Sequence, residues 1–171
     1  MTFLELAKQR YSVRSFRPEP VDEEKMARIL EAGHVAPTAC NFQPQKIYIA
    51  ESEEARKKLA TVCRFTFDAP VILVVGYDKD RAWKNKFMPG YCSGETDAAI
   101  VCTHMLLEAE AQGLGACWVG YFNAQEVARV LELPENVVVT ALVPMGYPGE
   151  EARPLPLHSQ YRDPEEIVSR I

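Results

Sequence analysis

Long apolar runs are missing from this sequence, which excludes one broad class of proteins at once. No stretch approaches the ~18 apolar residues that a membrane-spanning helix requires. The first residues, Met-Thr-Phe-Leu-Glu, also lack a basic segment followed by an apolar one, which is the pattern of a secretory signal. We therefore expect a cytoplasmic protein that has no membrane partner.

Cysteine and histidine are few and scattered. The five cysteines are odd in number and no two are spaced as C-x-x-C, so the sequence predicts neither a disulfide framework nor a zinc ribbon. The three histidines show no metal-ligand spacing either, and no metal site is predicted. Reduced cysteines agree with a cytoplasmic location.

An excess of positive charge is also absent. The 19 basic and 24 acidic residues give a formal charge of -5, which argues against nucleic acid as a partner. A composition of 47% hydrophobic and 25% charged residues is ordinary for a globular protein. We predict a single domain over residues 1–171 in which any anion site is a local feature.

The clearest local feature is the segment 10–16, Arg-Tyr-Ser-Val-Arg-Ser-Phe. If this segment is extended, its period of two places Arg10, Ser12 and Arg14 on one side. Two guanidinium forks with a hydroxyl between them suit a dianion such as phosphate. An exposed edge strand with solvated charges is the alternative interpretation.

Periodicity and capping residues predict an alternation of helices and strands along the chain. Helices are expected after the capping residues Thr2, Asp22, Ser52 and Asn123. Strands are expected over residues 46–50, 70–76 and 137–145. The longest helix is predicted to start at Thr96 or Asp97 and to cover residues 98–112. Since its first turns are apolar nearly all round, we expect it at the centre of the fold or in a subunit interface.

Three further segments lie between or after these elements. The loop 36–44 concentrates neutral hydrogen-bonding residues, and the loop 78–94 is either a lid or a plain connection. The glycines of segment 113–120 indicate a tight turn or a close approach to the backbone. Because this segment precedes a strand, a Rossmann dinucleotide site is rejected. Residues from about 150 to 171 are interpreted as an arm that packs on another surface, such as a second subunit.

Four separated motifs in this order resemble the FMN-dependent nitroreductase family, in its small single-domain form. They are residues 10–16, residues 36–44 (Ala-Pro-Thr-Ala-Cys-Asn-Phe-Gln-Pro), residues 113–120 (Gly-Leu-Gly-Ala-Cys-Trp-Val-Gly), and Gly146-Tyr-Pro followed by residues 162–168. The resemblance implies an α+β fold with a central mixed β-sheet flanked by helices. It also implies an intertwined homodimer built over the long helix, with exchanged C-terminal arms.

The same resemblance implies two FMN sites at the dimer interface. Arg10, Ser12 and Arg14 would hold the phosphate and the polar edge of FMN, and Arg162 would complete the phosphate site. The partner subunit would supply the residues beside the ring, which are Pro37, Thr38, Ala39, Asn41 and Gln43. The backbone of Val119 and Gly120 would lie against the isoalloxazine, near N5.

Two positions depart from the family's pattern. Gln160 stands where longer members often carry a lysine near the phosphate. Phe65 stands where many members present a basic side chain to the N1 and O2 edge of the flavin, and Arg64 or Arg14 is a candidate substitute. A positive group there stabilises the anionic reduced flavin.

The activity that the resemblance implies is an oxidoreductase working in two half-reactions. NAD(P)H gives hydride to N5 of FMN, and an electron-poor acceptor, a nitroaromatic, a quinone or an enone, is then reduced. The chemistry belongs to the cofactor, so no catalytic side chain is assigned. Three alternatives remain open: reductive dehalogenation or flavin breakdown on the same scaffold, FMN storage without turnover, and a structural dimer with an empty pocket. The choice between NADH and NADPH is open as well.

Overall fold

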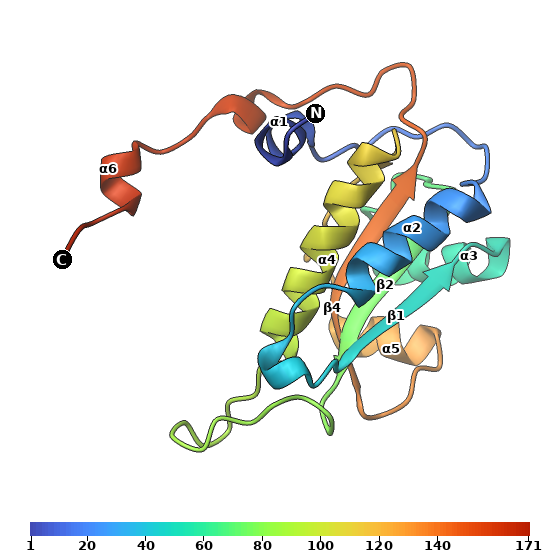
Figure 1. The fold of residues 1–171 in the computed structure, drawn as a ribbon. Helices are drawn as coiled ribbons and strands as arrows, with labels where there is room; N and C mark the ends of the chain where they lie inside the picture. The colour runs from blue at the N-terminus through green and yellow to red at the C-terminus, as the bar shows by residue number, and fades with distance from the viewer.

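A four-stranded antiparallel sheet with the strand order β1-β2-β4-β3 forms the centre of the computed structural model, which describes all 171 residues (Figure 1). The strands are β1 (Gln45–Ala50), β2 (Val71–Asp78), β3 (Gly115–Ala116) and β4 (Val137–Gly146). The helices are α1 (Phe3–Gln9), α2 (Glu23–His34), α3 (Glu53–Val62), α4 (Gly94–Ala111), α5 (Ala124–Val130) and α6 (Pro164–Ile167). Two short 3₁₀ turns, η1 (Ala39–Asn41) and η2 (Pro156–Ser159), complete the set.

The prediction of a mixed sheet is wrong for this chain. All three pairs of neighbouring strands are antiparallel. β2 and β3 run in the same direction, but β4 lies between them, so no two parallel strands are neighbours. The one parallel pairing is an isolated bridge between Ser12 and Ala116.

Helices cover both faces of the sheet. Alternate residues of the central strand β2 point to opposite faces, and apolar side chains on each face pack against helices. Leu73 and Val75 pack into a core with α2 and α4. Ile72 and Val74 pack into a second core, which contains Leu59 of α3 and residues of α5. The uninterrupted apolar run of β2 is therefore explained by burial on both faces.

Only one side of α4 is covered by its own chain. Ala98, Val101, Cys102 and Met105 are buried against the sheet and α2. The opposite side carries residues that are exposed or half-buried, among them Thr103 and Leu107. The helix begins at Gly94, earlier than predicted. Asp97 lies inside its first turn, and its side chain accepts from the amide of Ala39 instead of capping the helix.

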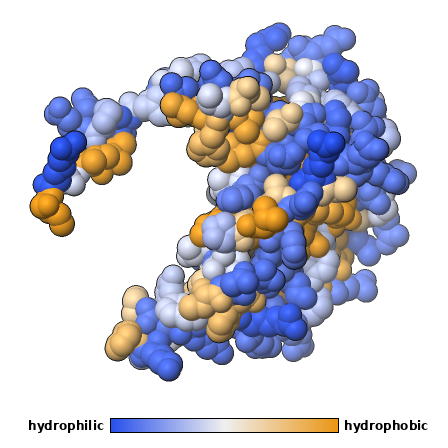
Figure 2. Space-filling view, in the orientation of Figure 1, coloured by the Kyte–Doolittle hydropathy of each residue, from blue (hydrophilic) through white to orange (hydrophobic).

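The end of the chain forms an arm that leaves the body of the molecule. After β4 it passes α1, where His158 Nε2 lies 3.1 Å from the carbonyl oxygen of Lys8, and its last residues reach away from the sheet (Figure 1). Apolar side chains are exposed along it, and Figure 2 shows apolar surface at its tip. They are Leu155, Leu157, Tyr161, Ile167, Val168 and Ile171. No helix in the structure combines the length and apolar character needed to span a membrane.

Replacing Gly115 by alanine is expected to destabilise the fold by about 1–3 kcal/mol, because it overpacks a tight contact. An added Cβ would lie 2.6 Å from Cγ2 of Val13, which is itself only 1% exposed. Urea denaturation measures the loss. The double variant Val13→Ala/Gly115→Ala removes both Cγ atoms but keeps Cβ of residue 13, which would lie 2.7 Å away, so it relieves the clash in part. The two changes should therefore not be additive, and strict additivity would contradict this contact.

Candidate functional site

The arginine-rich segment 10–16 lies along the end of the sheet in an extended conformation. The Val13 amide donates to the carbonyl of Ala116 at 3.1 Å, and the Arg17 amide donates to that of Tyr147 at 2.9 Å. Val13 is buried, whereas its neighbours Ser12 and Arg14 are not. The predicted alternation is therefore present, although the segment is paired only through isolated bridges at Ser12 and Phe16.

Arg10, Ser12 and Arg14 line one cavity of about 410 Å³. We call these three residues the anion clamp. Neither guanidinium takes part in an ion pair, and Nη1 of Arg14 donates to the carbonyl of Ser12 at 3.0 Å. The other lining residues come from α1, the segment 10–16 and the arm: Ala7, Tyr11, Leu155, Leu157, His158 and Tyr161. In a protein of net negative charge, two unpaired arginines beside a cavity are suited to hold an anion.

Cys117 lies directly behind the anion clamp. Burial raises the pKa of its thiol, while the charge of Arg14 and a hydrogen bond with Ser12 oppose that shift. The thiol is therefore held neutral, as in a small core residue, whereas a redox-active cysteine requires the thiolate.

Val119 and Gly120 follow β3 in the chain, and Val119 pairs with the same side of β4 as β3 does. Both backbone groups of Val119 pair with Leu142, at 2.8 and 3.0 Å. Gly120 is exposed, and an added Cβ there would meet only Trp118 Nε1, at 3.8 Å. The packing of the chain does not itself require glycine at this position, so open space remains for a ligand to approach the backbone.

Gly120 borders a second cavity of about 500 Å³, which it shares with Arg64. The Arg64 guanidinium lies 4.7 Å from the ring centroid of Phe65 and 5.9 Å from that of Tyr121. Phe65, which we expect at the family's basic position, thus supports a neighbouring arginine by cation–π contact. Arg14, the other candidate substitute, lies in the clamp cavity instead.

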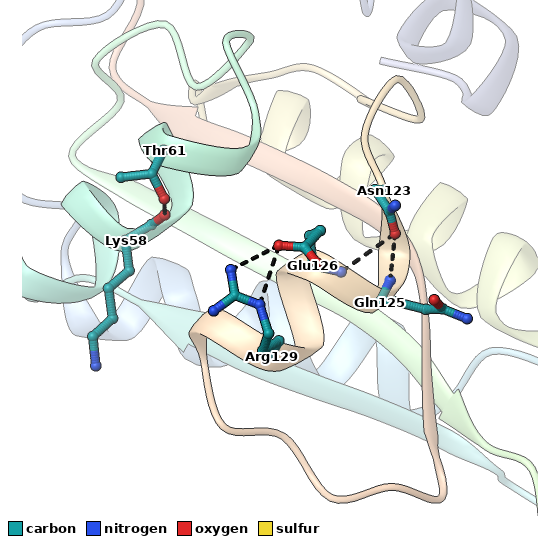
Figure 3. A network of polar contacts seen from close by, with 6 residues as sticks. All are labelled: Lys58, Thr61, Asn123, Gln125, Glu126 and Arg129. Carbon is teal, nitrogen blue, oxygen red and sulfur yellow. Dashed lines mark hydrogen bonds and ion pairs between the residues drawn. The ribbon is translucent and has the colours of Figure 1, made fainter.

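Asn123, the residue before α5, also lines this second cavity. Figure 3 shows the hydrogen bonds that it makes to the start of α5. The Asn123 side-chain oxygen accepts from the amides of Gln125 at 3.0 Å and Glu126 at 3.3 Å. Glu126 pairs in turn with Arg129 at 2.7 Å. The predicted N-cap therefore holds the turn that follows Gly120 in place.

Residues 36–44 form a tight loop with an internal hydrogen-bond network. Thr38 accepts from the amide of Gln43 through its hydroxyl, at 3.0 Å, and Nε2 of Gln43 donates to Oδ1 of Asn41, also at 3.0 Å. Cys40, Asn41 and Gln43 have φ values of 50°, 56° and 49°. These left-handed conformations are unusual for residues other than glycine, and such strain concentrates at functional sites.

The structure separates the two halves of the predicted site. The Ala39 amide donates to Asp97 near the start of α4, whereas Gln9, next to the anion clamp, donates to Glu110 near its end. These two helix positions are about 20 Å apart at the rise of an α-helix. Pro37, Thr38, Ala39, Asn41 and Gln43 thus lie at the opposite end of α4 from Arg10, Ser12 and Arg14.

Arg162 does not reach the anion clamp of its own chain. It lies on the arm outside the clamp cavity, where Nε pairs with Oε2 of Glu166 at 3.1 Å. Its role in a phosphate site remains a prediction.

The segment after β2 has more internal order than the sequence indicates. Lys84 pairs with Cys92 in an antiparallel bridge, and Phe87 at the tip is 95% exposed. Its base joins α4, since the amide of Ser93 donates to the carbonyl of Trp83 at 2.9 Å. A lid function for these residues remains a prediction.

Sequence reasoning missed Asp97 as a member of the site. It is 2% exposed and binds both the loop 36–44 and Ser93. The available signal was an acidic residue at the start of an otherwise apolar helix, which we interpreted only as a possible cap.

Comparison with known proteins gives one consistent family. The model of the nitroreductase family matches residues 7–66 and 62–147. A Methanothermobacter thermautotrophicus protein named NADH dehydrogenase/NAD(P)H nitroreductase is 30% identical over 157 residues, which are 88% of this chain and 79% of that protein.

Two solved structures show the same similarity in three dimensions. A nitroreductase family protein from Clostridium difficile is 36% identical, with a TM-score of 0.91 over 99% of this chain and 98% of its own. A Desulfovibrio desulfuricans protein, solved in complex with FMN, is 28% identical, with a TM-score of 0.81 over 98% of this chain and 95% of its own.

A thiol reagent is expected to modify Cys40 well before Cys102 or Cys117 in the native protein. Cys40 is exposed, whereas burial raises the pKa of Cys102 to about 12 and also raises that of Cys117. Since the thiolate is the reactive form, both buried thiols should stay inert until the protein unfolds. Timed alkylation followed by peptide mass spectrometry measures the order, and Cys40→Ser should remove the fastest phase. Early labelling of Cys117 would contradict this account.

Proposed function

Because this chain belongs to the nitroreductase family, we propose that it is an FMN-dependent oxidoreductase that passes reducing equivalents from NAD(P)H to an electron-poor acceptor. The acceptors proposed are nitroaromatics, quinones and enones. One observation carries the proposal: the anion clamp, with no carboxylate partner, lines a cavity at the end of the same edge that leads to Gly120. The FMN present in the Desulfovibrio desulfuricans structure agrees with this choice of cofactor.

The residues of the chain fit the chemical parts of FMN. The phosphate is a dianion, which suits the paired donors of Arg10 and Arg14 with the Ser12 hydroxyl between them. The ring is flat and largely apolar, and it requires a close approach to backbone, which Gly120 allows. When bound, FMN supplies the hydride chemistry, and the protein supplies orientation and electrostatics.

We assign Arg64 as the positive group that faces the polar edge of the flavin. It borders the cavity at Gly120 and is held by two aromatic rings, so its charge is kept beside that cavity. A fixed positive charge there favours negative charge on the ring, as family members with a basic residue near this position would. No side chain is given the role of general acid or nucleophile.

The functional unit proposed is a homodimer, because one chain places the clamp and the loop 36–44 at opposite ends of α4. A two-fold axis that packs the open side of α4 against its copy would bring each loop to the partner's clamp. The exposed apolar arm then has a surface to cover, and its Arg162 would reach a phosphate site on the other subunit. Each FMN would be enclosed by both chains.

Neutralising Arg10 should weaken the binding of FMN without weakening that of riboflavin, which lacks the phosphate. Loss of one charge-assisted hydrogen bond, worth about 1.5–3 kcal/mol, corresponds to a rise of about 10-fold to 150-fold in the Kd of FMN. Flavin fluorescence titration of Arg10→Gln measures both ligands. Arg17→Gln is the matched control, since Arg17 lies outside the clamp cavity and pairs with Glu19 at 3.5 Å. Equal weakening of FMN and riboflavin would contradict a phosphate role.

Anaerobic stopped-flow mixing tests the activity itself. FMN-loaded protein is mixed separately with NADH and NADPH, and the flavin absorbance is followed in the visible range. Rapid bleaching by at least one donor, reversed by a nitroaromatic or a quinone, is the expected result. Flavin that binds but is bleached by neither donor within seconds would overturn the proposal and favour storage or a specialised flavin chemistry.

A further inference from the structure

We propose that Asp97 is a positioning residue that holds the loop 36–44 in the conformation needed to contact the flavin ring. This inference rests on the proposed function, because it concerns the same cofactor. Asp97 touches no part of the anion clamp and acts through the backbone of Ala39. It is therefore a different kind of residue from those that would contact FMN.

The loop needs an external support because its own conformation is strained. Three of its residues, Cys40, Asn41 and Gln43, have left-handed backbone conformations. Its internal side-chain hydrogen bonds link Thr38, Asn41 and Gln43 to one another and do not join these residues to the rest of the fold. The bond from the Ala39 amide to Oδ1 of Asp97, at 2.8 Å, is its one side-chain hydrogen bond to another element.

The helix position, hydrogen bonds and burial of Asp97 suit this role. Its position in the first turn of α4 places the carboxylate in the favourable field at the helix N-terminus. Oδ2 accepts from the hydroxyl of Ser93 at 2.6 Å, so both carboxylate oxygens are occupied. Asp97 and Ser93 are 2% and 4% exposed, and water therefore competes little for either bond.

The same carboxylate links the loop to the segment after β2. Ser93, which binds Oδ2, also donates its amide to the carbonyl of Trp83 at 2.9 Å. One buried side chain thus ties the loop 36–44 and the base of the segment 79–93 to the start of α4. In the proposed homodimer this joined unit faces the flavin held by the other subunit's clamp.

The test compares Asp97→Ala with a matched change at Asp78, using FMN binding as the readout. Asp97→Ala leaves the Ala39 amide without its acceptor and should raise the Kd of FMN about 10-fold to 100-fold. Asp78 is also buried, at 6% exposure, but its carboxylate accepts from the Asp80 amide at 2.9 Å. Its only hydrogen bond to the loop runs from its backbone amide to the carbonyl of Pro44, at 2.8 Å, and the substitution keeps that amide. Asp78→Ala should lower the melting temperature yet leave the FMN Kd within about 3-fold of the parent value.

Rescue by the conservative variant separates positioning from simple destabilisation. Asp97→Asn keeps an oxygen for the Ala39 amide and offers an amide donor to Ser93, so its FMN Kd should stay within about 3-fold of the parent value. If Asp97→Ala fails to fold, Ser93→Ala takes its place, and it should raise the Kd more than Asp78→Ala does.

Two results would overturn the inference: an unchanged Kd in Asp97→Ala, or an equal rise in the Asp78 control. Parent protein that binds no FMN at all would instead overturn the proposed function, and the two failures are thus distinguishable.

Discussion

The fixed length of α4 is the constraint on which the rest of this structure depends. A helix holds its two ends apart at about 1.5 Å per residue, and no side-chain movement brings them closer. One end carries the loop 36–44 through Asp97, and the other is bonded through Glu110 to Gln9, next to the anion clamp. The two halves of the proposed cofactor site are therefore kept apart in one chain, and the homodimer proposed above would bring them together.

This constraint explains the distribution of apolar surface. The central strand β2 is buried on both faces by helices of its own chain, whereas α4 is buried on one side only. The half-buried Ile100 and Leu107 of α4 and the exposed apolar side chains of the arm are not fully covered by the chain itself, and exposed apolar patches mark interaction sites. We interpret both as surfaces prepared for the same partner.

The charged residues of the proposed site are also divided between the two ends of α4. Arg10 and Arg14 stand free of carboxylates at the clamp, and Arg64 is held by Phe65 and Tyr121 in the neighbouring cavity. The buried acid Asp97 lies at the other end of α4, where both of its carboxylate oxygens accept hydrogen bonds, from the Ala39 amide and the Ser93 hydroxyl. In the proposed site the positive charges would face the dianionic phosphate, while the carboxylate of Asp97 accepts from the backbone of the loop 36–44.

The sequence alone determined the features that depend on local physics. Capping side chains marked the starts of α1, α3 and α5, and the alternation around Val13 placed Arg10, Ser12 and Arg14 on one side, because both are decided within a few residues. Tertiary structure decided what depends on neighbours that are distant along the chain. The antiparallel sheet follows from β4 inserting between β2 and β3, and the role of Asp97 follows from Ala39, which is 58 positions away. The support of Arg64 by Tyr121 likewise arises only when α3 and α5 pack on one face of the sheet, because side chains so far apart in sequence meet only through the fold.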